Sequence, residues 1–238
     1  DFEKENGEFE HSEYYYENGI IDYVNELTGG QSLTQPVLWH LETAGRDRED
    51  KDDYKLKADI SFCASNTVNV IEYYHNSSFL EHGGSPDKAG RSAFVWAVDH
   101  YLKAQGKYNK NESKINFGDV EDCLVLVSNS YSTQTSYANQ TKKAINNSFI
   151  AEAMTDFLKH QLEVYFAENP GEADKFTSQV LINKRSRETA ESTRLNLKKK
   201  LTGTIDIANR VDKFVNCRTK DPERRELYAA VVHECDCV

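Results

Sequence analysis

Apolar and polar residues alternate over residues 56–62, and residues 68–74 repeat the pattern with Val, Ile and Tyr. Alternation with a period of two is typical of a strand that has one buried face. The short polar segment 64–66 separates the two runs, so we expect them to pair as a hairpin.

Two further runs predict strands. Residues 37–41 are mostly apolar, and residues 124–127 are continuously apolar, which is typical of a strand buried on both faces. Between the predicted strands, residues 45–53 are nearly all charged and predict a solvated turn. The apolar residues of 93–102 recur at helical spacing, so we expect a helix that begins near Asp87, after the Gly-Gly pair at 83–84.

The second half of the chain has a helical pattern. The Asn-Asn-Ser sequence at 146–148 precedes apolar residues at helical spacing as far as 166, and Asn-Pro-Gly at 169–171 interrupts them. A second long helix is expected from about 172 to 201, ended by Thr-Gly at 202–203. The order of elements predicts an α+β fold with about four strands in a mixed sheet, packed with helices and extended by a long C-terminal helix.

Composition narrows the class of protein. The chain has 238 residues, 38% of them hydrophobic, and a formal net charge of −10, which argues against non-specific wrapping of nucleic acid by the whole surface. Five scattered cysteines suggest free thiols in a reducing compartment. No stretch approaches the roughly 20 apolar residues of a membrane span. These features predict a cytoplasmic protein without a membrane partner, and the first residue, Asp1, suggests an excised fragment.

A polar loop is the first candidate site. It follows the predicted strand at 124–127 and contains Gln140 and Lys142. A flexible ammonium and an amide can both donate to a phosphate. An ordinary surface loop is the alternative interpretation.

Basic residues on the predicted long helix are the second candidate. Cations near a helix C-terminus are favoured by the helix dipole, so a solvated face explains part of the pattern. The alternative is a stripe that contacts DNA phosphates without sequence preference. The candidate DNA-binding residues are Lys184, Arg185, Arg187, Arg194, Lys198, Lys199 and Lys200.

The last residues are a third candidate, because residues 233–237 read His-Glu-Cys-Asp-Cys. Cysteine and histidine bind zinc, and carboxylates bind magnesium. A closed zinc site needs four ligands, however, and these three lie within one five-residue tip. We therefore expect no metal site here.

Several short segments together resemble one family in the right order. Residues 16–20 read Tyr-Glu-Asn-Gly-Ile, residues 83–85 Gly-Gly-Ser, residues 140–142 Gln-Thr-Lys and residues 185–188 Arg-Ser-Arg-Glu. Residues 212–228 resemble the entry to a metal-binding Toprim domain. The chain thus resembles the transducer domain of the ATPase subunit of bacterial type IIA DNA topoisomerases, namely DNA gyrase B or its topoisomerase IV counterpart, which the sequence does not separate.

The resemblance implies a fold similar to domain 2 of ribosomal protein S5, with a left-handed βαβ crossover. It implies that residues 1–15 end a GHKL-type ATPase domain, that 16–203 form the transducer domain, and that 204–238 are a linker and the beginning of a Toprim region. Two segments depart from the family. Residues 85–91 lack its usual histidine, and residues 229–237 lack the Toprim continuation, so the Toprim magnesium site is not carried over.

The resemblance also implies a function. In the family, ATP and Mg²⁺ bind the preceding domain, and two ATPase subunits close around a captured duplex. By resemblance, Lys142 contacts the γ-phosphate and Gln140 helps to hold the attacking water and the phosphate. The implied partners are duplex DNA, the breakage-reunion subunit of the topoisomerase and a second copy of the ATPase subunit. The fragment alone is expected to hold no cofactor and to hydrolyse no ATP.

Three other interpretations compete with this one. The first is a GHKL transducer of the mismatch-repair protein MutL or of a heat-shock chaperone. The second is a non-enzymatic DNA-binding module that uses only the basic helix. The third is a metal-dependent nuclease that uses Glu234 and Asp236.

Overall fold

The computed structural model describes residues 2–203 and residue 221. The chain divides into two compact units, Asp1–Glu188 and Thr189–Val238. The first unit contains every strand and four of the five helices of the described residues. The fifth helix begins in the first unit and ends in the second.

The first unit is built on a five-stranded mixed sheet with the strand order β3-β4-β7-β5-β6. The pattern of apolar residues predicts four of these strands. The fifth, β6, has only two residues and forms a tight hairpin with β5, so it leaves little trace in the pattern. The strands are β3 (Val37–Gly45), β4 (Tyr54–Ala64), β5 (Val70–His75), β6 (Ser78–Phe79) and β7 (Leu124–Ser132).

The expected hairpin between residues 56–62 and 68–74 is wrong. β4 pairs antiparallel with β3 and with β7, whereas β5 pairs parallel with β7. The continuously apolar start of β7 is buried on both faces, as predicted, because Leu124 and Leu126 pack in the core with α2 and α4 while Val125 and Val127 pack with α1. The pairing places β7 between β4 and β5, so it separates two strands that are adjacent in the sequence.

The helices of the described residues are α1 (Ile20–Leu27), α2 (Ser85–Ala104), α3 (Phe117–Glu121), α4 (Ser148–Glu168) and α5 (Pro170–Gly203). The three longest, α2, α4 and α5, follow the predicted pattern closely. α2 begins at Ser85, two residues before the expected start near Asp87. The short α3 is an addition, fixed by a capping box between Asn116 and Asp119.

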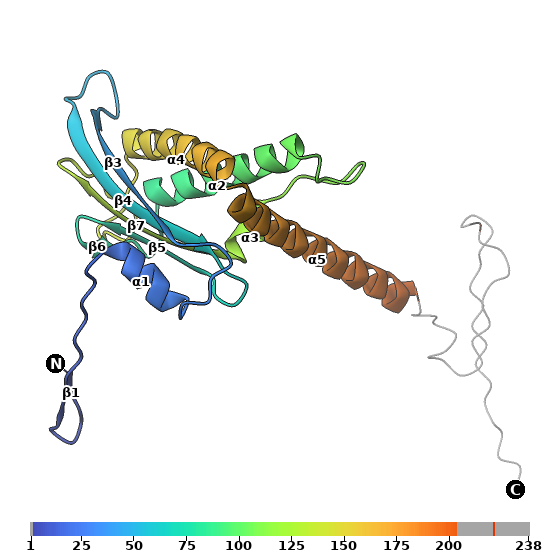
Figure 1. Cartoon of the computed structure of the whole chain (residues 1–238), viewed down its shortest axis with the longest axis horizontal. Helices are drawn as coiled ribbons and strands as arrows, with labels where there is room; N and C mark the ends of the chain where they lie inside the picture. Colours follow the sequence, from blue (N-terminus) through green and yellow to red (C-terminus); the bar gives the residue numbers. More distant parts are fainter. Residues whose placement is uncertain (1, 204–220, 222–238) are drawn as a thin grey trace, which may run out of the picture. The chain divides into compact units, whose positions relative to one another are not determined.

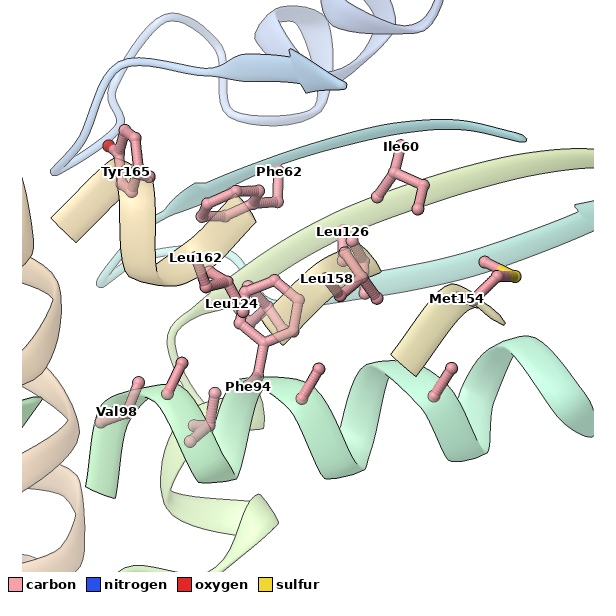
Figure 2. Close-up of a cluster of buried hydrophobic side chains, with 14 of the residues drawn as sticks. Ile60, Phe62, Phe94, Val98, Leu124, Leu126, Met154, Leu158, Leu162 and Tyr165 are labelled. Atoms are coloured by element: carbon pink, nitrogen blue, oxygen red, sulfur yellow. The ribbon is translucent and has the colours of Figure 1, made fainter. Parts of the chain in front are cut away.

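α2 and α4 cover one face of the sheet and α1 covers part of the other (Figure 1). Figure 2 shows the larger core, in which side chains of α4 and α2 meet those of β4 and β7. Phe62 of β4 lies in its middle, with its ring centroid 4.9 Å from that of Trp39, 5.1 Å from that of Phe94 and 5.7 Å from that of Tyr165. Aromatic pairs at such distances add to the stabilisation from burial alone.

β5 and β7 are parallel, and the chain between them passes through β6, α2 and α3. The βαβ crossover is therefore present, and its left-handed sense stays a prediction. The mixed sheet, the packed helices and the long C-terminal helix confirm the α+β class.

The domain assignments at the two ends of the chain are not tested by the structure. β1 (Phe2–Glu3) and β2 (Phe9–Glu10) form a separate, exposed antiparallel hairpin. The assignment of residues 1–15 to an ATPase domain and of 204–238 to a Toprim region stays a prediction. The motif at 212–228, apart from residue 221, and the terminal His-Glu-Cys-Asp-Cys sequence lie outside the described residues.

Cys63 and Cys123 are buried free thiols, as expected of small apolar side chains. Burial raises the pKa of each thiol to about 12. No helix among residues 2–203 combines the length and the apolar character needed to cross a membrane.

Candidate functional site

Residues 133–147 connect β7 to α4 and carry Gln140 and Lys142, both of which are exposed. The tip of this loop is a tight turn, in which Lys142 N donates to Asn139 O at 3.3 Å. Lys142 has a φ of 55°, and its Nζ atom lies 5.5 Å from the centre of the Tyr137 ring. The tip thus presents an amide and an ammonium group to solvent.

The two arms of the loop pair with each other below the tip. Ala138 N donates to Ala144 O at 2.9 Å, and Asn146 N donates to Ser136 O at 2.8 Å. These backbone hydrogen bonds give the loop the form of a short hairpin, so the position of its arms determines where the tip lies.

The second arm is anchored on the start of α2. Ser85 N donates to Ile145 O at 2.9 Å, and His82 N donates to Lys143 O at 2.9 Å. Gly84 has a φ of 88°, and a Cβ atom placed on it would lie 2.1 Å from Ile145 O. The second glycine of the Gly-Gly pair is therefore required for the close approach of the loop to the helix.

The first arm is anchored on the end of β5. Asn76 Oδ1 accepts from Ser132 N at 3.1 Å, and Asn76 Nδ2 donates to Ser132 O at 3.2 Å. Beside it, the fully buried His75 contacts three hydroxyl groups. Sequence reasoning missed His75, although the hydroxyl-rich run at 130–136 was a signal that a polar partner was needed.

The base of the loop is also tied to the turn between β3 and β4. Asp47 Oδ1 accepts from Phe149 N at 2.9 Å and so caps α4, while Asn147 Nδ2 donates to Asp47 Oδ2 at 2.9 Å. Burial alone would raise the pKa of Asp47, but hydrogen bonds from Phe149 N, Tyr54 and Asn147 lower it. Asp47 thus has a structural role within the charged turn predicted from the sequence.

The basic residues at the middle of α5 have acidic partners. Lys184 Nζ lies 3.1 Å from Glu112 Oε1 and 3.0 Å from Glu188 Oε2, and its side chain is 0% exposed. Arg185 Nε lies 3.0 Å from the same Glu112 oxygen. Arg185, more than Lys184, lowers the pKa of the Glu112 carboxyl group to about 2. These contacts fasten α5 to the segment before α3.

The expectation that all seven cations form one surface stripe is therefore wrong for Lys184. Its side chain is buried in the first unit, and one of its two acidic partners, Glu112, comes 72 positions earlier in the chain. Arg187 pairs with the buried Asp119 at 2.7 Å. The remaining four candidates, Arg194, Lys198, Lys199 and Lys200, are exposed and belong to the second unit. DNA contact by any of these residues stays a prediction.

No group of three or more His, Cys, Asp or Glu side chains that could hold a metal ion occurs within the described part of the chain. The sequence at 233–237 lies outside that part.

A comparison with models of protein families identifies the family of this chain. A family model described as DNA gyrase B matches residues 19–196. The chain belongs to the DNA gyrase B family. The matched residues include the loop at 133–147, both of its anchors and most of α5.

Relatives in this family are similar over most of the chain. The DNA gyrase B protein of Metamycoplasma arthritidis is 30% identical over 216 residues, which cover 90% of this chain and 33% of that protein. The DNA gyrase B protein of Campylobacter jejuni is 22% identical and is aligned over 94% of this chain and 28% of its own length. The chain thus spans about a third of the length of the curated relatives that it matches.

Solved structures share the fold. The 43K ATPase domain of Thermus thermophilus gyrase B, in complex with an aminocoumarin, has a TM-score of 0.62 and 21% identity over 74% of this chain and 45% of that one. The topoisomerase IV ATP-binding domain of Francisella tularensis has a TM-score of 0.59 and 19% identity over 73% and 44% of the two chains. At these identities the likeness concerns the fold alone.

Proposed function

We propose that this chain is the transducer region of the ATPase subunit of a type IIA topoisomerase and that its loop at 133–147 senses the terminal phosphate of ATP. The observation that carries the proposal is the form of the loop. Gln140 and Lys142 are exposed at its tip, while both arms below the tip are anchored to the sheet and to α2. Membership of the DNA gyrase B family supports the topoisomerase interpretation over the MutL and chaperone alternatives.

The chemistry of the tip suits a phosphate. The Lys142 ammonium offsets the negative charge of the γ-phosphate, and the Gln140 amide donates to a phosphate oxygen or orients the attacking water. The neighbouring Lys143 is paired with Glu81 and so has a different role. By this proposal ATP and Mg²⁺ would bind an ATPase domain outside this chain, and Mg²⁺ there would supply positive charge that offsets the charge of the phosphates.

Docking of the tip would be reversible. The ammonium and amide gain their phosphate partner when ATP binds and lose it when the phosphate leaves after hydrolysis. An ordered state with nucleotide and a released state without it are the two states of a switch.

The anchors provide a path from the loop to the helices. Both arms are held by residues 75–85, and α2 begins at the end of this segment. α2 packs against α4, and the start of α5 completes the same core through Phe176. A displacement of the loop therefore acts on the whole helical layer, and we propose that this layer relays ATP binding and hydrolysis to the DNA gate during strand passage.

The partners follow from this role. They are duplex DNA, the breakage-reunion subunit of the topoisomerase and a second copy of the ATPase subunit in the ATP-closed gate, all in the bacterial cytoplasm. We assign the DNA contacts to the exposed cations of the second unit, Arg194 and Lys198–Lys200. The isolated chain would hydrolyse no ATP, because the sequence carries no complete nucleotide-binding fingerprint.

Hydrogen exchange in an ATPase-active protein that contains this chain tests the sensor role. We expect the amides of residues 139–143 to exchange more slowly with a non-hydrolysable ATP analogue than with ADP or without nucleotide. Equal exchange of these amides in all three states would contradict the proposal.

A further inference from the structure

We infer that His75 is the positioning residue that sets where the loop at 133–147 leaves the sheet and, through the loop arm, where Gln140 and Lys142 lie. The inference rests on the proposed function, because it concerns the placement of the same loop tip. It adds a residue that makes no contact with the tip itself.

His75 is the last residue of β5 and is 0% exposed. Its two ring nitrogens contact different parts of the following chain. Nδ1 lies 2.8 Å from Ser130 Oγ, which is inside β7. Nε2 lies 3.0 Å from Thr135 Oγ1, which is in the loop, and 3.1 Å from Ser132 Oγ, at the end of β7. The imidazole therefore bridges the sheet and the first arm of the loop.

The surrounding hydrogen bonds favour a proton on Nδ1 of His75. Ser130 Oγ donates its hydrogen to Tyr74 O at 3.1 Å, so it can only accept from His75 Nδ1. Thr135 Oγ1 accepts from Asn76 Nδ2 at 3.1 Å, which leaves its own hydrogen for His75 Nε2. A neutral imidazole with its proton on Nδ1 satisfies both contacts. Ser132 Oγ donates to Gln134 O at 2.6 Å, so its contact with Nε2 supplies no hydrogen bond in this form of the ring.

Asn76 reinforces the same anchor. Its backbone N donates to Ser130 O at 2.9 Å as the last hydrogen bond of the parallel ladder. Its side-chain amide then pairs with the backbone N and O of Ser132, as a further strand residue would. The pairing of the sheet therefore continues past the end of β5 as far as Ser132, and Asn76 Nδ2 also donates to the hydroxyl group of Thr135.

The tip is a short distance along the chain from this anchor. Ser136, the residue after Thr135, accepts the hydrogen bond from Asn146 that closes the hairpin of the loop. Only residues 137 and 138 separate this pair from the turn at 139–142. A change at Thr135 thus reaches the tip through a few residues whose arms are joined by backbone hydrogen bonds.

The two sides of the imidazole provide a matched pair of variants. Thr135→Val removes the hydroxyl group on the loop side and keeps the shape of the side chain. Ser130→Ala removes the hydroxyl group on the strand side, away from the loop. Each variant removes one hydroxyl partner of His75 and at least one further hydrogen bond, from Asn76 to Thr135 or from Ser130 to Tyr74, so we expect similar decreases in the Tm of the folded chain.

Their effects on the loop should differ. In the 238-residue chain, we expect Thr135→Val to speed the hydrogen exchange of the Ser136 and Ala138 amides at least ten-fold, and Ser130→Ala to change it by less than three-fold. In an ATPase-active protein that contains the chain, Thr135→Val should lower kcat about ten-fold or more with little change in KM, since a small displacement of catalytic groups has effects of this size. Ser130→Ala should stay within about two-fold of wild type in both constants.

Two substitutions of His75 provide a second comparison. In His75→Gln the amide oxygen can reach the position of Nε2 and accept from Thr135, whereas in His75→Asn the shorter amide reaches only the position of Nδ1. We expect His75→Gln to retain most of the kcat and His75→Asn to resemble Thr135→Val.

The outcomes separate this inference from the proposed function. If Lys142→Ala abolishes turnover but Thr135→Val and Ser130→Ala behave alike, His75 has only a structural role and the inference is overturned. If Lys142→Ala leaves turnover unchanged, the proposed function fails, and the inference fails with it.

Discussion

Arg187 and Asp119 form a two-point ion pair between α5 and α3. Arg187 Nε donates to Asp119 Oδ1 at 2.7 Å, and Nη2 donates to Oδ2 at 3.0 Å. The Asp119 side chain is 1% exposed and also completes the capping box of α3. An arginine that sequence reasoning assigned to DNA is thus part of the attachment of the long helix to the first unit.

We predict that Arg187→Ala lowers the free energy of unfolding by about 2–3 kcal/mol, because it leaves a buried carboxylate without its charged partner. Urea denaturation followed by circular dichroism measures this change. Arg194→Ala, at an exposed position on the same helix, should change the free energy by less than about 0.5 kcal/mol. Equal effects of the two substitutions would show that the ion pair contributes no stability.

The salt dependence of DNA binding tests the remaining cations. Replacing Arg194, Lys198, Lys199 and Lys200 together with Ala should weaken duplex binding and reduce the slope of log K against log salt by up to about 3–4. A variant with four exposed lysines of the first unit replaced, Lys51, Lys55, Lys57 and Lys88, has the same net charge and should retain the slope. Equal slopes in the two variants would remove the DNA-binding role from α5.

Gly84 and Gly30 both have positive φ values, of 88° and 73°, but differ in their surroundings. A Cβ atom on Gly84 would collide with Ile145 O, whereas nothing lies within 4 Å of a Cβ atom on Gly30. We expect Gly30→Ala to cost about 1–2 kcal/mol through the backbone alone and Gly84→Ala about 1–3 kcal/mol more. Thermal unfolding compares the two, and similar losses would contradict the close approach of the loop to α2.

The pH dependence of stability should contain a contribution from His75. Burial lowers the pKa of its imidazole from 6.5 to about 4. The folded state therefore favours the neutral form, so this contribution is complete above pH 6.5 and is lost as the pH falls towards 4. Between pH 7.5 and 4.5 we expect the wild type to lose about 2–3 kcal/mol more than His75→Gln. Parallel pH profiles of unfolding in urea would show that His75 is not buried in its neutral form.

The sequence predicts the elements of this fold well because their signals are local. The continuous apolar run at 124–127 identifies the central strand, and the helical spacing around Phe157 and Leu162 identifies α4. The order of the strands in the sheet could not be predicted in this way. Whether β4 pairs with β5 or with β7 depends on residues 60 to 76 positions away, and no local pattern of β4 contains that information.

The sequence likewise predicts one part of the candidate site, the loop, but not the residues that anchor it. The Gln-Thr-Lys sequence identifies the loop through its resemblance to a family. Its anchors were not predicted, because His75 and Gly84 acquire their roles only when β5 and the start of α2 lie beside residues 130–145. Similarly, the basic character of Lys184 suggests a surface position until its partner Glu112, distant in the sequence, is brought beside it.

The most direct test of the sensor role compares two adjacent lysines in an ATPase-active protein that contains this chain. Lys142 lies at the exposed tip, whereas Lys143 is paired with Glu81 at the surface, where such a pair contributes little to stability. We predict that Lys142→Ala lowers the ATPase rate at least a hundred-fold, while Lys143→Ala retains most of the rate and both variants bind duplex DNA at low salt as the wild type does. An unchanged ATPase rate in Lys142→Ala would contradict the account and leave the chain a member of its family whose loop does not sense the nucleotide.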